Sequence, residues 1–155
     1  MFKRLGILVV ASIAVFVFAG VVSASLVNVI SPNGGETLTA GQVWKVSIGI
    51  NYAGVPTNIG VGKYKLSYSC QGSDFISDTG QRIWNVITIR SCGLFTCPSD
   101  YLWEVPNVQV KISKPDRDCK VRVQLFDLKG GALGSDRSDD WFTIKPYSGV
   151  PADIP

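Results

Sequence analysis

Four cysteines are the residues of this chain with the most definite chemistry. Cys70, Cys92, Cys97 and Cys119 form an even set, and an even number of cysteines in an exported chain indicates disulfide bonds. A four-thiolate zinc site is the alternative. It is disfavoured because the closest pair is separated by four residues, the chain has no histidine, and an oxidising compartment favours disulfides. The sequence therefore predicts two disulfides.

Three carboxylates gather near the end of the chain. Asp136, Asp139 and Asp140 are close in sequence, and several oxygen ligands on one loop are what a surface calcium site uses. Their spacing matches no EF-hand loop, and a solvated turn before the last strand is the plainer interpretation. We treat the three aspartates as weak calcium candidates and expect no cofactor.

Groups suited to catalysis are scarce. General acid–base chemistry most often uses histidine, which is absent, and a reactive thiol needs an unpaired cysteine. A carboxylate pair of the glycosidase kind is the remaining option. The two glutamates, Glu36 and Glu104, fall in a turn and at an outward strand position. The sequence therefore predicts a protein that is not an enzyme.

The first 24 residues have the pattern of a secretory signal peptide. Lys3 and Arg4 precede an apolar run over residues 5–22, and three small residues follow at 23–25. We expect cleavage there and a secreted or cell-surface protein. The alternative is a retained membrane anchor, because the apolar run is at the lower limit for spanning a bilayer. Membrane attachment is expected only in that case.

Charge gives little indication of a polyanionic partner. Removal of Lys3 and Arg4 lowers the 15 basic residues to 13, against 12 acidic ones, so the mature net charge is about +1. Nucleic-acid-binding proteins usually present a clustered basic face. No nucleic-acid partner is expected.

Short alternating runs, separated by Gly, Pro, Asn and Asp, predict an all-β chain after the signal. Strands are expected at residues 26–30, 42–50, 63–70, 82–90, 101–105, 108–112, 119–125 and 141–144. About 7–8 strands with apolar faces favour two packed antiparallel sheets, an Ig-like or fibronectin-III-like sandwich. The predicted domain spans residues 25–145, and a proline-rich tail spans 146–155.

Strand direction predicts the disulfide pairing. Because successive strands alternate in direction, Cys70 and Cys119 fall at one pole of the sandwich, and Cys92 and Cys97 at the other. Bonded Cα atoms lie within about 7 Å, whereas strands of this length separate the poles by roughly 20 Å. The expected bonds are Cys70–Cys119 and Cys92–Cys97, unless an extra strand at 108–112 shifts the order.

Two small sets of side chains are candidates for binding. Leu94 and Phe95 lie inside the ring that Cys92 and Cys97 would close at a pole, and a stiffened apolar loop loses little entropy on docking. The alternative is that both fold back onto the rim of the core.

Tryptophans suggest a second candidate, because flat apolar rings stack on sugars. Trp44, Trp103 and Trp141 lie in strand patterns that indicate the core, which leaves Trp84 with Tyr68 as the candidate platform.

Four segments resemble the Ser-Thr-rich GPI-anchored family of extracellular Ig-like domains, which includes the yeast cell-wall-synthesis proteins. They are Ser-Pro-Asn-Gly-Gly-Glu at 31–36, Tyr-Leu-Trp-Glu-Val-Pro at 101–106, Cys-Lys-Val-Arg-Val at 119–123 and Ser-Asp-Asp-Trp-Phe-Thr-Ile at 138–144. The resemblance implies a β-sandwich at the cell surface and names no ligand.

The leading hypothesis is a non-catalytic secreted or cell-surface module for adhesion or extracellular assembly. Its partner would be an extracellular protein or a second copy of the chain, because edge strands of a sandwich can pair with a strand of another chain. The alternative hypothesis is a carbohydrate-binding or cell-wall glycan assembly module, whose partner would be a polysaccharide.

Overall fold

The structure is a computed structural model that describes residues 25–71, 75–93, 96–106 and 117–147. The expected signal peptide, the expected strand at 108–112, Leu94 and Phe95, and most of the expected tail lie outside the described residues. The described chain forms a short 3-10 turn, η1 (Tyr52–Gly54), and nine strands. The strands are β1 (Val27–Ser31), β2 (Thr37–Thr39), β3 (Val43–Ile50), β4 (Val61–Cys70), β5 (Asn85–Ser91), β6 (Asp100–Glu104), β7 (Arg117–Asp127), β8 (Ala132–Arg137) and β9 (Phe142–Lys145).

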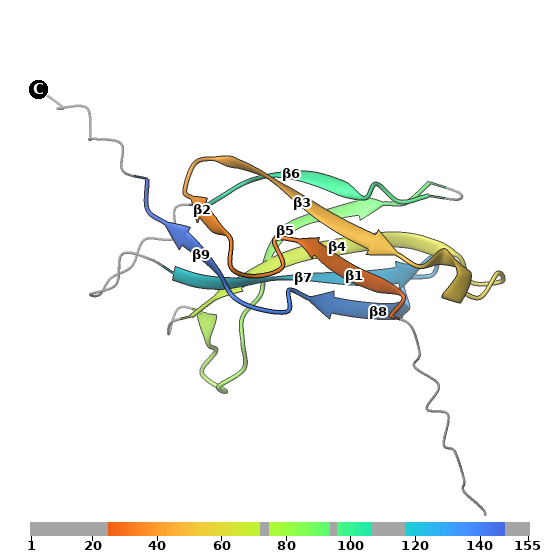
Figure 1. Cartoon of the computed structure of the whole chain (residues 1–155). Coiled ribbons are helices and arrows are strands. Elements are labelled where there is room, and N and C mark those ends of the chain that lie inside the picture. Colours follow the sequence, from red (N-terminus) through yellow and green to blue (C-terminus); the bar gives the residue numbers. More distant parts are fainter. Residues whose placement is uncertain (1–24, 72–74, 94–95, 107–116, 148–155) are drawn as a thin grey trace, which may run out of the picture.

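The strands form two sheets packed face to face (Figure 1). The smaller sheet has the order β1-β3-β6. The larger sheet has the order β2-β9-β7-β4-β5, and β8 also pairs with β7. All pairs are antiparallel except β2 with β9. This strand order is that of an Ig-like sandwich of the fibronectin III type, so the predicted fold class is confirmed.

The core lies between the two sheets and follows the predicted alternation. On β7, Val121, Val123 and Leu125 are fully buried, while Arg122 and Gln124 between them face outward. Apolar burial of this kind supplies most of the stability of such a domain.

Aromatic rings fill one end of this core. Trp103 is 5% exposed and packs edge-on against Phe142, with ring centroids 6.4 Å apart. The two other tryptophans expected in the core, Trp44 and Trp141, are only half-buried, so that expectation was too strong. Trp44 packs partly against the core, and Trp141 lies beneath Arg82 and Lys120.

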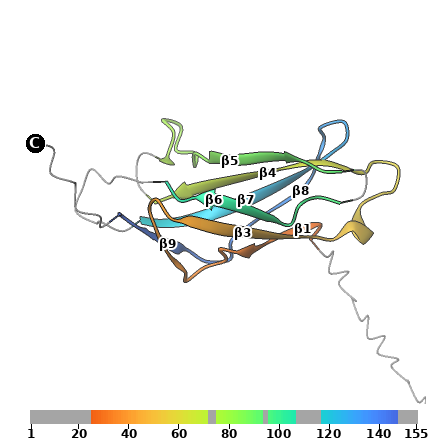
Figure 2. The same ribbon diagram turned by 90° about the horizontal axis from the view of Figure 1, so that it is seen from above.

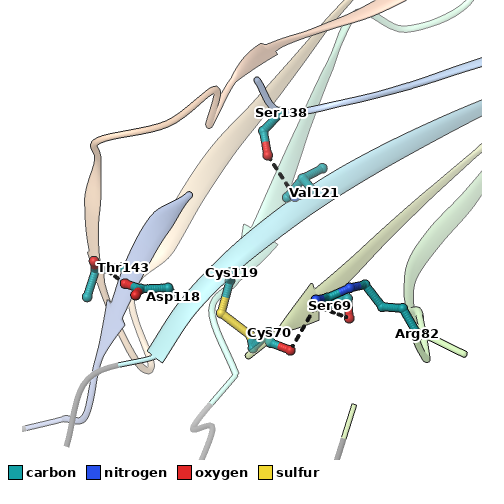
Figure 3. Close-up of a disulfide and its surroundings, with 8 residues drawn as sticks. All are labelled: Ser69, Cys70, Arg82, Asp118, Cys119, Val121, Ser138 and Thr143. Atoms are coloured by element: carbon teal, nitrogen blue, oxygen red, sulfur yellow. Dashed lines mark hydrogen bonds between the residues drawn. A yellow bond between two sulfur atoms is a disulfide. The ribbon is translucent and has the colours of Figure 1, made fainter. Parts of the chain in front are cut away.

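Two disulfides close the two poles. Cys70 and Cys119 lie opposite each other in the β4–β7 register and are bonded, as Figure 3 shows. Cys92 and Cys97 are bonded at the other pole. These are the two bonds that strand direction led us to expect. In the chain-entropy picture the Cys70–Cys119 bond, which closes a loop of 49 positions, stabilises the fold by about 4 kcal/mol.

The opening and closing segments of the domain, residues 31–36 and 138–144, bind each other and form what we call the terminal clasp. The Glu36 carboxylate accepts hydrogen bonds from the backbone N–H groups of Asn33 and Gly34, at 2.8 and 2.7 Å. Asn33 in turn exchanges two hydrogen bonds of 2.8 Å with Asp139. Two of the segments that carry the family resemblance are therefore one structural unit, and its side chains hold the fold together.

Two strands were not predicted from the sequence. Strand β2 has only three residues, too few for a periodic signal. Strand β8 contains Gly134, Ser135 and Asp136, which are poor strand formers with no apolar alternation. Both form because a neighbouring strand, β9 or β7, supplies the hydrogen-bonding partner.

Candidate functional site

Strand β5 is an edge of the larger sheet. It pairs with β4 on one side, from Ser91 opposite Lys63 to Asn85 opposite Tyr68, and no described strand pairs with its other side. Figure 2 shows β5 at the margin of the molecule. An edge strand presents unpaired backbone N–H and C=O groups that can pair with another strand. Strand β5 therefore offers a backbone template of seven residues.

The side chains of β5 make this edge unusual. Val86 and Ile89 are 51% and 57% exposed, and they lie opposite Ser67 and Lys65 of β4, two alternate positions on the outer side of the sheet. A register shift between these two pairs places Val86 and Ile89 on the same face although they are three positions apart, while Ile87 packs partly against the core. This shift also explains why residues 82–90 appeared apolar on both faces.

The expected strand at 82–90 starts three residues too early. Arg82 forms an isolated bridge with Ile76 instead of joining β5. Ile76 and Ile83 are also exposed, which extends the apolar character of this side of the domain.

Strands β1 and β6, the two edges of the smaller sheet, are better protected than β5. On β1, the N–H of Val29 donates to the Asp136 carboxylate at 2.8 Å, so a side chain of β8 occupies this edge. Strand β6 carries Asp100 and Glu104 near its ends, and Lys45 lies 3.8 Å from the Asp100 carboxylate. Charges and covered backbone groups are common means of preventing strand addition.

Strand β5 lacks such protection. Its one charged side chain is Arg90, and its guanidinium lies over the ring of Tyr101 on the smaller sheet, 5.2 Å from the ring centroid. The charge is therefore directed toward the other sheet and away from the open edge.

The pole that carries Cys92–Cys97 contains a pocket of about 380 Å³. The Tyr52 hydroxyl accepts a hydrogen bond of 2.6 Å from the Cys97 N–H, which ties the disulfide loop to η1. Leu94 and Phe95 belong to this loop but lie outside the described residues, so their binding role stays a prediction. The pocket is lined by Tyr52, Val55, Pro56, Thr57, Gly60, Val61, Cys92, Gly93 and Thr96.

Trp84 and Tyr68 do not form the expected sugar platform, because they lie on opposite faces of the larger sheet. Trp84 is on the outer face, beneath the Arg122 guanidinium at 4.4 Å from its ring centroid. Tyr68 points inward, with its ring 5.4 Å from that of Trp103. Burial raises the pKa of the Tyr68 phenol, and a hydrogen bond with Asn85 partly opposes this rise.

The three calcium candidates also have separate partners. Asp136 accepts from Val29, Asp139 is bound to Asn33, and Asp140 accepts from the backbone N–H of Trp141 at 2.7 Å. Among the described residues, no three His, Cys, Asp or Glu side chains are grouped so that they could hold a metal ion. Asp136 links β8 to β1, whereas Asp139 and Asp140 bind groups of the terminal clasp.

No helical segment in the described ranges has the length and apolar character required to cross a membrane.

Comparison with known proteins finds similarity in structure but none in sequence family. No family model matches the sequence, and no curated protein matches it. The resemblance to the Ser-Thr-rich GPI-anchored family therefore stays a prediction.

Two solved structures are similar in shape. The fibronectin(III)-like modules of CbhA from Clostridium thermocellum align with a TM-score of 0.44 and 11% identity, over 77% of this chain and 96% of that chain. The alkylpurine DNA glycosylase AlkC of Pseudomonas fluorescens, bound to DNA containing an abasic site analog, gives a TM-score of 0.35 and 16% identity over 78% of this chain, which spans 31% of that structure. The assignment of the fold rests on the strand order of the chain itself.

Proposed function

We propose that this protein is a non-catalytic module of the cell exterior that assembles with a second copy of itself through strand β5. The observation that carries the proposal is the open edge of β5, with Val86 and Ile89 exposed beside it on one face. The two disulfides and the expected signal peptide support an oxidising, extracellular setting.

An antiparallel pair of two β5 strands is self-complementary. When the two-fold axis passes between Ile87 and Thr88, Val86 of one copy lies opposite Ile89 of the other. Each exposed apolar side chain then gains an apolar cross-strand neighbour, and the two larger sheets become one continuous sheet. The same residues serve on both copies, as a closed two-fold interface requires.

The test is the mass in solution of the wild type and of two double variants. Val86→Lys with Ile89→Lys places two charges beside the edge and should convert a dimer into a monomer. Val43→Lys with Leu102→Lys is the matched control, because these two side chains are 63% and 68% exposed on the smaller sheet. We expect the control to remain a dimer by gel filtration with light scattering.

Two results would count against the proposal. A wild type that is monomeric at every accessible concentration would exclude self-assembly. Equal dissociation of the control variant would show that association depends on general surface hydrophobicity and not on β5.

A further inference from the structure

Six cations on the outer face of the larger sheet lie on or beside its strands β4, β7 and β8, and we call this group the cationic face. Two come from β4, two from β7, one from β8 and one from the segment before β5. In the described part of the chain, none of the six forms an ion pair with a carboxylate. They are Lys63, Lys65, Arg82, Lys120, Arg122 and Arg137.

The strand register sets these cations side by side. Arg122 on β7 lies opposite Arg137 on β8, and on its other side it lies opposite Ser67 of β4. Neighbouring strands are about 4.8 Å apart, and alternate residues on one strand about 6.6 Å. The cationic face is therefore a band of closely spaced positive charges running along β4 and β7.

Aromatic rings hold several of these cations against the sheet. The Lys63 ammonium lies 5.6 Å from the centroid of Phe126. Arg82 and Lys120 both lie over Trp141, at 5.1 and 5.3 Å from the ring centroid. Cation–π contacts of this kind restrict side chains that would otherwise be mobile.

Backbone contacts restrict two of the six further. Arg82 donates to the Cys70 carbonyl at 3.1 Å, as Figure 3 shows, and Lys120 donates to the Ser138 and Asp139 carbonyls at 3.2 and 3.0 Å. Because these contacts neutralise no charge, the cations are positioned and yet unpaired. A ligand that binds them loses less side-chain entropy than one that binds free lysines.

Negative charge on this face is sparse. At the described outward positions of β4, β7 and β8, the one carboxylate is Asp118, which accepts a hydrogen bond from the Thr143 hydroxyl at 3.1 Å. The sign of the face is therefore positive, although the net charge of the whole chain is only +3. Such a face attracts a polymer that repeats negative charge along its length.

We propose that the cationic face binds an acidic polysaccharide, a sugar polymer that carries carboxylate groups at regular intervals. Lysine and arginine pair with carboxylates, and the flat band accepts an extended chain. The rings of Trp84 and Trp141 hold Arg122, Arg82 and Lys120 in fixed positions on this face. Nucleic acid is the competing polyanion, but the two disulfides favour a compartment outside the cell. The site is the outer face of the sheet and does not depend on pairing through the β5 edge.

The experiment measures binding to polygalacturonate at low ionic strength by titration calorimetry. The test variant is Lys65→Glu with Arg137→Glu, two outward side chains that form no hydrogen bond with any other described residue. The control is Lys45→Glu with Lys129→Glu, which makes the same change in net charge on the smaller sheet and in the β7–β8 turn. Thermal unfolding of both variants checks that the fold is intact.

We expect the test variant to bind at least about tenfold more weakly than wild type and the control to stay within about twofold, with binding of the wild type falling as salt is added. The proposal is overturned if wild type does not bind polygalacturonate, or if the control loses as much affinity as the test variant. It is also overturned if a neutral galactan binds equally well, or if an oligonucleotide or anionic vesicles bind more tightly through the same side chains.

Discussion

The phenol of Tyr64 is fully buried between the sheets, and its burial makes the stability of the domain depend on pH. Burial raises the pKa of Tyr64 above its ordinary value of 10.0, Arg90 lowers it, and Tyr101 and Asp100 raise it. The unfolded phenol thus loses its proton at lower pH than the folded one. Because the unfolded state then binds fewer protons, stability falls as pH rises past 10.0.

We predict that Tyr64→Phe makes the melting temperature less sensitive to alkaline pH than that of the wild type. The comparison is made by thermal unfolding at neutral pH and above the ordinary phenol pKa of 10.0. Tyr147→Phe is the control, because Tyr147 is 67% exposed. Parallel pH curves for Tyr64→Phe and wild type would contradict the assignment.

Burial of single residues was predicted correctly where apolar and polar residues alternate along a strand. The inward positions of β7, from Cys119 to Leu125, are all buried as expected. The prediction that Trp84 forms a platform with Tyr68 was wrong, because an isolated tryptophan belongs to no periodic pattern that would show which residues surround it. The Arg122 guanidinium that covers it comes from a strand nearly forty positions further along the chain.

Among the elements, the terminal clasp makes the clearest prediction. Glu36 accepts two backbone hydrogen bonds through a carboxylate, and hydrogen bonds to a charged group contribute roughly 1.5–3 kcal/mol each. Because the clasp is partly exposed, we expect Glu36→Ala to lower the free energy of unfolding by about 1–3 kcal/mol. Denaturant unfolding measures this loss.

Glu104→Ala is the matched control for the clasp. Glu104 is the exposed end of β6, and its removal should change stability by less than about 0.5 kcal/mol. If the two variants were equally stable, the Glu36 carboxylate would not stabilise the opening turn of the clasp.

Element boundaries were predictable to within a few residues wherever alternation was strong. Seven of the eight expected strands correspond to strands of the structure, and the eighth lies outside the described residues. Strands β2 and β8 were missed because they depend on partners distant in sequence. The open edge at β5 could not be predicted from the sequence either, because the order of strands in a sheet is set by the whole fold.

For the molecule as a whole, the distribution of charge matters more than its sum. The net charge of about +1 expected for the mature chain gave no reason to expect a basic face. Strand alternation nevertheless sorts cations onto one face, as the runs Lys63-Tyr64-Lys65 and Lys120-Val121-Arg122 show. Alternating cations on two paired strands were the signal in the sequence that predicts such a face.

The proposed edge and the cationic face adjoin each other, because Ile89 of β5 lies opposite Lys65 of the cationic face. In the proposed assembly, β5 pairs with a second copy and the cationic face is directed outward from the same sheet. Joining two copies edge to edge would extend that sheet and place two cationic faces on one continuous surface. Two linked faces bind a long polymer more tightly than one, because the second contact is intramolecular.

The most direct measurement is amide hydrogen exchange of the wild type at low and high protein concentration. If copies pair through β5, the amides of Asn85–Ser91 gain protection as concentration rises, while those of β1 and β6 do not change. Protection that is independent of concentration, or that appears at the Cys92–Cys97 pole instead of at β5, would contradict assembly through this edge.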